Sequence, residues 1–406
     1  MVSVCVIGGG TAGKAAAVEA GWRGADVTIV ERRATPEPPW RSWPGLISGS
    51  SEEEGFLDGH GSFPPTLVND EASAAGPGFV ALSSGQRLPC DSAIIATGTR
   101  FEPVCFPGAR KPGVFVLDGA EKYAEVGRAC TSLGGVVVTG EGYRGLEVAD
   151  RLISRGVRVC LMVSCWQCEP PSPAVLEVIE DVARDGGTQV QRGDVSRAVG
   201  NGRVEAVVVG GSVVPCEAVL VTPRRAPNPL RAAVKLGRSG AVEVDLGMRT
   251  SYPSLFAAGG CAELKGGAAA SGVLNAEPSL SGRIAGSNCA GSRLSLRGTR
   301  IDDMHVFGLR WSRIGRRGGT PAALDNQTET VSHRWRSDCA CTITHQKFSE
   351  EVIRVESIQP SAFSPAGLPP LGAGVTLEAL AFGLGSSDIS PISETARLGL
   401  REWPES

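Results

Sequence analysis

The residues with the clearest chemical meaning are three glycines near the start of the chain, Gly8, Gly10 and Gly13. Their G-x-G-x-x-G spacing is typical of a turn that holds a pyrophosphate. The first glycine allows the tight turn, the second lets the ligand approach the backbone, and the third lets a helix pack closely on a strand. The phosphates then lie at the helix N-terminus, where unpaired N–H groups favour negative charge. Glu31, at the end of the next apolar run, is placed to accept hydrogen bonds from a ribose diol.

A β-α-β unit is needed to position these residues, and the pattern around them predicts one. Apolar residues 4–7 predict a buried strand, residues 15–20 a compact helix and residues 27–30 a second strand. A glycine turn alone would be weak support. With both strands, the helix and the acid present, the stretch predicts a dinucleotide-binding unit, or a descendant of one, in preference to an ordinary turn.

The same arrangement returns in residues 135–163, where Gly140, Gly142 and Gly145 have the same spacing between an apolar strand and an amphipathic helix. One such fingerprint could arise by chance, whereas two copies, each lying between a predicted strand and a predicted helix, are hard to explain by chance. The chain therefore binds two nucleotides, or descends from one that did.

The remaining pattern predicts an α/β fold followed by an α+β segment. Residues 32–55 are rich in proline and glycine and predict a loop. Beyond about residue 292 the character changes: alternation at 351–358 predicts an antiparallel sheet. Further strands are expected at 59–63, 78–82, 92–99, 114–117, 218–222, 241–245 and 255–258, a hairpin at 204–215, and helices at 175–184, 377–382 and 394–400.

Composition excludes several classes of function. The net charge is -3 and no basic block stands out, so nothing favours nucleic acid. No apolar run approaches the length of a membrane span and no signal peptide precedes the first strand, so a cytoplasmic protein is expected. The length of 406 residues predicts two or three domains.

The 12 cysteines are interpreted mainly as small buried apolar residues. Cys165 and Cys168 have C-x-x-C spacing, which leaves open a redox-active or incidental disulfide. Cys339 and Cys341 form a second close pair, but a structural zinc would require both pairs to converge, and no metal is expected. The four histidines show no spacing typical of hydrolases or metal sites.

The order of the motifs resembles the pyridine nucleotide-disulfide oxidoreductase family, the flavoproteins with two dinucleotide-binding domains. The motifs are VIGGGTAG at 6–13 with Glu31, IIATGT at 94–99, TGEGYRGLEVA at 139–149 and MRTSYPSLFAAGGCAE at 248–263. The segments at 298–315 and 375–400 resemble the dimerisation domain of its NADH oxidase and coenzyme A-disulfide reductase branch.

The resemblance implies two Rossmann-like domains, for FAD and NAD(P)H, and a C-terminal α+β dimerisation domain. The implied boundaries are 1–110 and 238–291 for FAD, 111–237 for NAD(P)H and 292–406 for dimerisation. FAD contacts would come from Gly8, Gly10, Thr11, Ala12, Gly13, Glu31, Arg32, Ala96, Thr97, Gly98, Gly259 and Gly260, and NAD(P)H contacts from Gly140, Gly142, Tyr143, Arg144 and Gly145. Glu147 would lie near the nicotinamide. Trp40 and Trp43 would either stack on the flavin or fill the core.

Several positions depart from the family pattern. The loop after Glu31 contains no redox cysteine. Gly260 replaces the aspartate that hydrogen-bonds the flavin side chain, a loss of about 1.5–3 kcal/mol, or roughly one to two decades of affinity. Pro223 stands at a glycine position, and the segment 49–59 is short. The second strand of the NAD(P)H unit ends at residues 162–164 with neither the acid that selects NADH nor an arginine for NADPH.

Two functions follow as hypotheses. The first is a homodimeric NAD(P)H oxidoreductase that passes electrons through FAD to oxygen, a quinone, a dye or a protein carrier without a redox cysteine. The second is a non-catalytic or regulatory nucleotide-binding protein, or one subunit of a larger complex, with weakened or lost flavin binding.

Overall fold

The computed structural model describes residues 1–33, 43–48, 65–129, 132–163, 166, 170–266, 278–296, 299–316, 328–346 and 352–360. The chain forms two compact units, each built from segments that are distant in sequence. The first contains Met1–Pro103, Leu117–Glu125 and Pro223–Arg297, and the second contains Val104–Val116, Val126–Thr222 and Gly298–Ser406. The four-part domain boundaries expected from the sequence remain a prediction.

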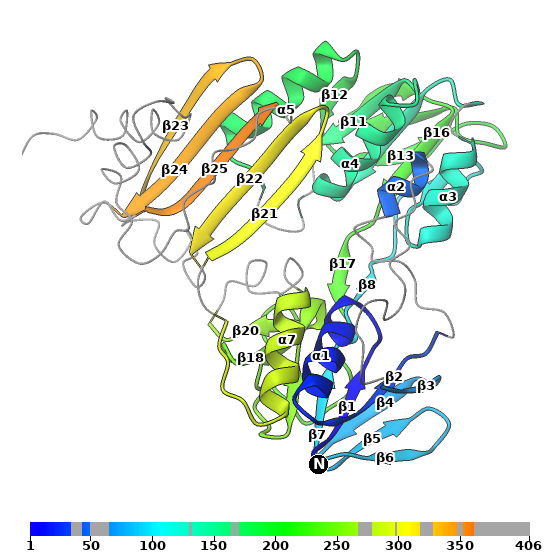
Figure 1. The fold of residues 1–406 in the computed structure, drawn as a ribbon. Helices are drawn as coiled ribbons and strands as arrows, with labels where there is room; N and C mark the ends of the chain where they lie inside the picture. Colours follow the sequence, from blue (N-terminus) through cyan, green and yellow to red (C-terminus); the bar gives the residue numbers. More distant parts are fainter. Residues whose placement is uncertain are drawn as a thin grey trace, which may run out of the picture. The chain divides into compact units, whose positions relative to one another are not determined.

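The first unit is organised around a parallel five-stranded sheet of order β19-β7-β1-β2-β3 (Figure 1). Its strands are β1 (Ser3–Ile7), β2 (Asp26–Val30), β3 (Thr66–Val68), β7 (Ser92–Ile95) and β19 (Leu255–Ala257). The helix α1 (Thr11–Trp22) connects β1 to β2, which confirms the predicted β-α-β unit. Because β1 is flanked on both sides by parallel strands, its apolar residues are almost completely buried.

Smaller sheets complete this unit. An antiparallel sheet contains β4 (Ala72–Gly76), β5 (Phe79–Leu82) and β6 (Arg87–Pro89), which includes the strand expected at 78–82. Two-stranded pairs join β8 (Thr99–Phe101) to β17 (Arg225–Pro227), and β18 (Val242–Val244) to β20 (Ala262–Leu264). The strand expected at 92–99 ends at Ile95, where the chain turns before β8.

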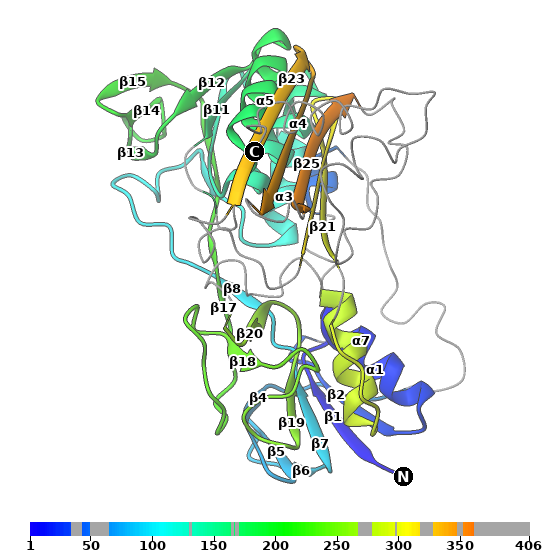
Figure 2. The ribbon, with the colours of Figure 1, turned by 90° about the vertical axis from the view of Figure 1, so that its left-hand side faces the viewer.

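Helix α7 (Pro278–Cys289) packs along α1 at very short range (Figure 2). A Cβ atom on Gly282 would overlap the carbonyl oxygen of Ala12, and one on Gly286 would overlap that of Ala16. The two helices therefore meet backbone to backbone, which small residues alone permit. This contact fixes α1, the helix that begins at the first fingerprint.

The second unit has its own parallel sheet, of order β12-β11-β10-β16-β9. The strands are β9 (Val114–Val116), β10 (Val136–Gly140), β11 (Val159–Val163), β12 (Gln189–Arg192) and β16 (Ala218–Thr222), with helices α4 (Gly142–Ile153) and α5 (Pro173–Asp185). This confirms the second β-α-β unit, so the fold is α/β with Rossmann-like units. The predicted hairpin is β14 (Ala206–Val209) with β15 (Ser212–Pro215), joined by an unpredicted strand, β13 (Val195–Val199).

The predicted C-terminal antiparallel sheet is confirmed and has the order β21-β22-β25-β24-β23. Its strands are β21 (Thr299–Val306), β22 (Leu309–Arg316), β23 (Thr328–Arg336), β24 (Cys339–Gln346) and β25 (Val352–Pro360). The sheet packs on α4 and α5 of the same unit (Figure 1). The hydroxyls of Ser172 and Thr342 lie 2.9 Å apart, and the N–H of Phe307 donates to Asp150 Oδ1 at 2.8 Å.

Three of the described helices were not expected from the sequence. The prediction of a loop over 32–55 is wrong at α2 (Trp43–Ser48), where Trp43, Pro44 and Ile47 bury one face of a short helix. Helices α3 (Ala120–Ala129) and α7 were also missed. The expected strand at 59–63 and the helices at 377–382 and 394–400 lie outside the described residues. Among the described helices, none combines the length and apolar character needed to cross a bilayer.

Replacing Gly286 by alanine should lower stability by about 1–3 kcal/mol, because the added methyl group forces α1 and α7 apart. Thermal unfolding followed by circular dichroism measures the effect. Arg283→Ala is the matched control, since Arg283 lies on the exposed face of the same helix. An unchanged melting temperature for Gly286→Ala would contradict the backbone contact.

Candidate functional site

Two glycines of the first fingerprint are fixed by close packing. Gly8 has a φ of +106°, and a Cβ placed there would lie 2.5 Å from the carbonyl oxygen of Ala96. A Cβ on Gly13 would overlap the carbonyl oxygen of Gly8. These two positions therefore shape the turn between β1 and α1 and hold β7 against it.

Gly10, the middle glycine, faces open space. It precedes α1 in an extended conformation that any residue can adopt, and no atom of the described residues lies within 4 Å of a Cβ built there. Gly10 is the N-cap residue of α1 and supplies no side-chain hydrogen bond to the helix. An anion could therefore approach both the backbone of Gly10 and the unpaired N–H groups of the helix.

The carboxylate of Glu31 closes one side of this turn. Its Oε2 accepts a hydrogen bond from the N–H of Gly9 at 2.7 Å, and its Oε1 accepts one from the N–H of Arg33 at 3.0 Å. An ionised carboxylate has about four lone-pair sites, so two acceptor positions remain for a ribose diol. Arg32, which the resemblance assigned to the flavin, is exposed and 3.7 Å from Glu71 in an ion pair.

The other residues expected around FAD come from separate segments that meet this turn. The Thr97 hydroxyl donates to the carbonyl of Asn228 at 2.5 Å, and Gly98 follows with a positive φ. Gly259 and Gly260 lie in a buried 3₁₀ turn, and a Cβ on Gly259 would lie 2.8 Å from Cβ of Ala12. Tertiary structure thus gathers Ala96, Thr97, Gly98, Gly259 and Gly260 beside Gly8, Thr11, Ala12 and Gly13; their roles in binding remain predictions.

Trp43 is buried beside two other aromatic rings. Its side chain is 6% exposed, and its ring centroid is 6.1 Å from that of Phe101 and 5.8 Å from that of Tyr123. This placement favours the packing interpretation over flavin stacking. Trp40 lies outside the described residues.

The second fingerprint differs from the first at its middle glycine. Gly140 forms a tight turn against the carbonyl of Thr222, as Gly8 does against Ala96. At Gly142, however, the space is filled: a Cβ there would lie 2.6 Å from Cε3 of the Trp166 indole. Gly145 is not tightly packed, because the nearest atom to a Cβ there is 3.9 Å away.

Charged side chains also surround this turn. The carboxylate of Glu141 caps α4 by accepting a hydrogen bond from the N–H of Arg144 at 2.9 Å. Glu147, expected near a nicotinamide, forms an ion pair with Arg144, whose Nη1 is 2.9 Å from its Oε2. The pair neutralises the carboxylate that the resemblance placed in the site.

Trp166 and Glu141 were missed by the sequence reasoning. The C-x-x-C spacing points to Cys165 and Cys168, which lie outside the described residues, and gives no signal for the tryptophan between them. The available signal was its position: a residue that follows the second strand of a β-α-β unit lies at the same sheet edge as the glycine turn.

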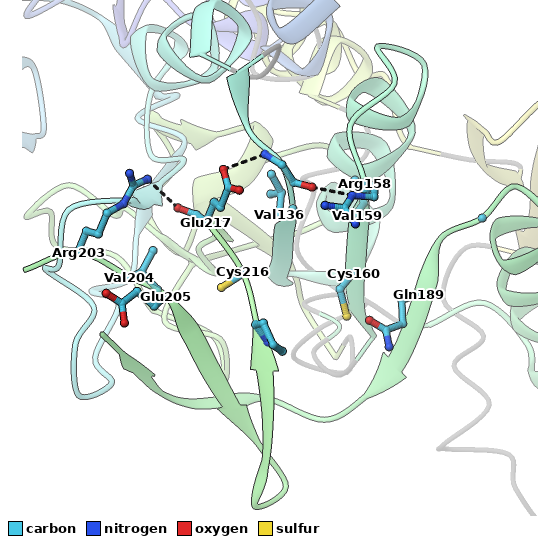
Figure 3. Close-up of a pocket in the computed structure, with 14 residues that line it drawn as sticks. Val136, Arg158, Val159, Cys160, Gln189, Arg203, Val204, Glu205, Cys216 and Glu217 are labelled. Carbon is cyan, nitrogen blue, oxygen red and sulfur yellow. Dashed lines mark hydrogen bonds between the residues drawn. The ribbon is translucent and has the colours of Figure 1, made fainter. Parts of the chain in front are cut away.

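A separate hollow of about 630 Å³ lies at the opposite edge of the second parallel sheet, where its strands begin (Figure 3). Arg158, Arg203 and Glu217 stand at its rim, with the thiols of Cys160 and Cys216 beneath. Burial raises the pKa of each thiol to about 11. Neutral thiols are weak nucleophiles, so neither is a candidate for catalysis at neutral pH.

Comparison with characterised proteins adds an independent line of evidence. A NAD(P)H sulfur oxidoreductase (CoA-dependent) of Pyrococcus abyssi is 26% identical over 328 residues, covering 73% of this chain and 71% of the relative. An NADH oxidase of Methanocaldococcus jannaschii is 31% identical over 224 residues, covering 50% and 47%. A rubredoxin-NAD(+) reductase of Pseudomonas putida is 26% identical over 277 residues, covering 64% and 72%.

Solved structures share the fold. A NAD-dependent persulfide reductase from A. fulgidus superposes with a TM-score of 0.80 at 22% identity, covering 98% of this chain and 83% of that chain. A water-forming NADH oxidase from Lactobacillus brevis gives 0.78 at 16% identity, covering 99% and 98%.

Gly10→Ala should leave the melting temperature unchanged and weaken FAD binding by about tenfold or more, because the methyl group projects only into the space where the pyrophosphate would approach. Fluorescence titration of the apoprotein with FAD measures the affinity. Gly13→Ala is the contrasting variant: its methyl group meets backbone, so the melting temperature should fall. Equal FAD affinity for Gly10→Ala and the unmodified protein would show that the pyrophosphate does not bind at this turn.

Alkylation of Cys160 and Cys216 should be slow at pH 8 and rise about 100-fold by pH 10, because the thiolate reacts and its population grows tenfold per pH unit below a pKa of about 11. The exposed Cys105 serves as the internal reference. Iodoacetamide labelling followed by peptide mass spectrometry resolves each site. Rapid labelling of Cys160 at pH 8 would contradict the raised pKa.

The fit to the two cofactors is unequal. The first fingerprint, with Gly10 open and Glu31 beside it, suits the ADP half of FAD, whereas the indole over Gly142 fills the pyrophosphate position of the second. The sequence pattern described as pyridine nucleotide-disulphide oxidoreductase matches residues 2–279, more than half of the chain. The chain therefore belongs to the pyridine nucleotide-disulphide oxidoreductase family, whose members are oxidoreductases that use FAD and NAD(P)H.

Proposed function

We propose that this protein is an FAD-dependent NAD(P)H oxidoreductase that delivers electrons from the flavin directly to an external acceptor. The observation that carries the proposal is the open backbone at Gly10, with the Glu31 carboxylate at its side, in a chain of this family. Bound FAD supplies the redox chemistry by accepting a hydride and releasing electrons to the acceptor.

The chain's own residues provide binding and orientation. The N-terminus of α1 and the backbone at Gly10 hold the pyrophosphate, and Glu31 accepts hydrogen bonds from the ribose. The close approach of Gly8 to the carbonyl oxygen of Ala96, and of Gly259 to Cβ of Ala12, holds the neighbouring loops in place around it. Gly260 provides no carboxylate for the flavin side chain, so FAD affinity depends more heavily on the first fingerprint.

Direct transfer follows from the distribution of cysteines. Between Cys5 and Cys90 the sequence contains none, although the loop after Glu31 is where the family's redox cysteine belongs. Without a thiolate there, the flavin has no partner for an intramolecular disulfide cycle. The relatives named as an NADH oxidase and a rubredoxin reductase support oxygen or a small protein carrier as acceptor, and a cytoplasmic homodimer is part of the proposal.

A second candidate is a non-catalytic nucleotide-binding protein or subunit. The indole over Gly142 and the ion pair of Glu147 with Arg144 favour it, because both occupy groups that the NAD(P)H site would use. In this alternative FAD, or ADP alone, binds at the first fingerprint and serves assembly.

The purified protein, supplemented with FAD and gel-filtered, should show flavin absorption bands that bleach on anaerobic addition of NADH or NADPH. Reoxidation by oxygen, a quinone or a protein carrier then identifies the acceptor. Glu31→Ala is the control, since losing the ribose contact should lower the retained flavin.

Dithionite separates the two candidates. A retained flavin that bleaches with dithionite but with neither nicotinamide nucleotide would favour the non-catalytic alternative. A colourless protein would show that the first fingerprint has lost FAD.

A further inference from the structure

The two fingerprints provide an internal comparison. Gly10 and Gly142 hold equivalent positions in the G-x-G-x-x-G spacing, and both lie where a helix begins. Among the described parts of the chain, no atom lies within 4 Å of a Cβ built on Gly10, whereas Cε3, Cδ2 and Cζ3 of Trp166 lie 2.6, 2.7 and 2.8 Å from one built on Gly142. The indole therefore covers the backbone surface that a pyrophosphate would approach.

Trp166 packs on Tyr143, which in turn packs on Trp311. Its ring centroid lies 4.8 Å from that of Tyr143, at an interplanar angle of 77° typical of an edge-to-face contact. Tyr143 in turn lies 5.4 Å from Trp311 on β22. The cover is thus continuous with the C-terminal sheet.

Buried polar groups fix the far end of this ring stack. Trp311 Nε1 donates to Glu356 Oε1 at 2.6 Å, and Oε1 also accepts from the N–H of Ser172 at 3.0 Å. Arg313 Nη2 donates to the Tyr143 hydroxyl at 3.4 Å. Trp311 and Glu356 are almost fully buried, so Tyr143 packs against a buried, hydrogen-bonded pair while its other side meets the indole.

The charge at this turn also opposes an incoming anion. The Glu141 carboxylate accepts from the N–H of Arg144 and occupies the N-terminus of α4, the place that the phosphates would take. At α1, by contrast, the N-cap residue is Gly10, which supplies no side-chain cap, and the nearby Glu31 carboxylate accepts from the N–H of Gly9, outside the helix. A pyrophosphate therefore has to displace an indole and compete with a carboxylate for a helix N–H at the second fingerprint, whereas the N–H groups of α1 are not capped by the N-cap residue at the first.

We propose that Trp166 is a cover over the second nucleotide site, and that NAD(P)H binds only after the indole leaves Gly142. The inference rests on the proposed function, because it concerns the same nucleotide. A covered site lowers the apparent affinity by the fraction of molecules in the open state. Trp166 is accordingly a residue that controls access to the site and does not itself react.

The nucleotide-independent part of the test is a double-mutant cycle. Gly142→Ala should lower the melting temperature by about 3–10 °C, because its methyl group meets the indole. In a Trp166→Leu background the loss should largely disappear. Gly145→Ala is the matched control and should be neutral or slightly stabilising. If Gly142→Ala lowered the melting temperature equally in both backgrounds, the indole would not be covering Gly142 and the proposal would be wrong.

The binding part uses isothermal titration of the full, FAD-supplemented chain with NADH and with NADPH. Trp166→Ala and Trp166→Leu should each bind at least one of them tenfold or more tightly than the unmodified protein, whereas Trp22→Leu, an exposed tryptophan of α1, should not. Two variants are used because leucine retains part of the packing on Tyr143.

The outcomes distinguish a failure of the proposed cover from a failure of the proposed function. Equal or weaker binding by both Trp166 variants, with measurable binding by the unmodified protein, would overturn the cover and leave the proposed function standing. Binding by none of the proteins would overturn the proposed function and the cover with it, since an uncovered site should then have accepted the nucleotide.

Discussion

Backbone contacts too close for any side chain are the constraint on which the first nucleotide turn depends. Gly13 touches Gly8, Gly8 touches Ala96, and the α1 backbone touches α7 at Gly282 and Gly286. These contacts leave β1, α1 and β7 little freedom to move apart, so the exposed backbone at Gly10 is held in place by its surroundings. Pre-organisation of this kind lowers the entropy that a ligand must overcome on binding.

The same glycine spacing leads to a different result in the second unit. There the tight turn at Gly140 is kept, but Gly145 is loosely packed and Gly142 is covered. The difference comes from residues outside the motif. Trp166 follows β11, and Trp311 on β22, 145 residues further along the chain, supports it through Tyr143. A fingerprint therefore specifies a turn, and the neighbours of the turn decide whether it is open to a ligand.

Contact between the C-terminal sheet and α4 and α5 connects the second site to a part of the chain with no nucleotide motif. Ser172, Asp150 and Tyr143 each make hydrogen bonds to that sheet or to the loop between its strands. Glu356 is almost fully buried, so it accepts its hydrogen bonds from Trp311 and Ser172 in a largely dry environment, and this desolvation raises the pKa of its carboxyl group. Substitutions in the sheet would thus alter the packing at the second fingerprint.

The sequence by itself determined both β-α-β units, the hairpin and the presence of a C-terminal antiparallel sheet, because apolar periodicity and glycine spacing are local signals. It also predicted cofactor contacts at Gly8, Gly10, Gly13 and Glu31, and these roles remain predictions. It missed α2, α3 and α7, whose apolar faces become evident only against their partners. Only the tertiary structure decided that Trp43 is buried, that Glu147 is paired with Arg144 and that Trp166 covers Gly142, since each depends on contacts whose partners no local pattern encodes.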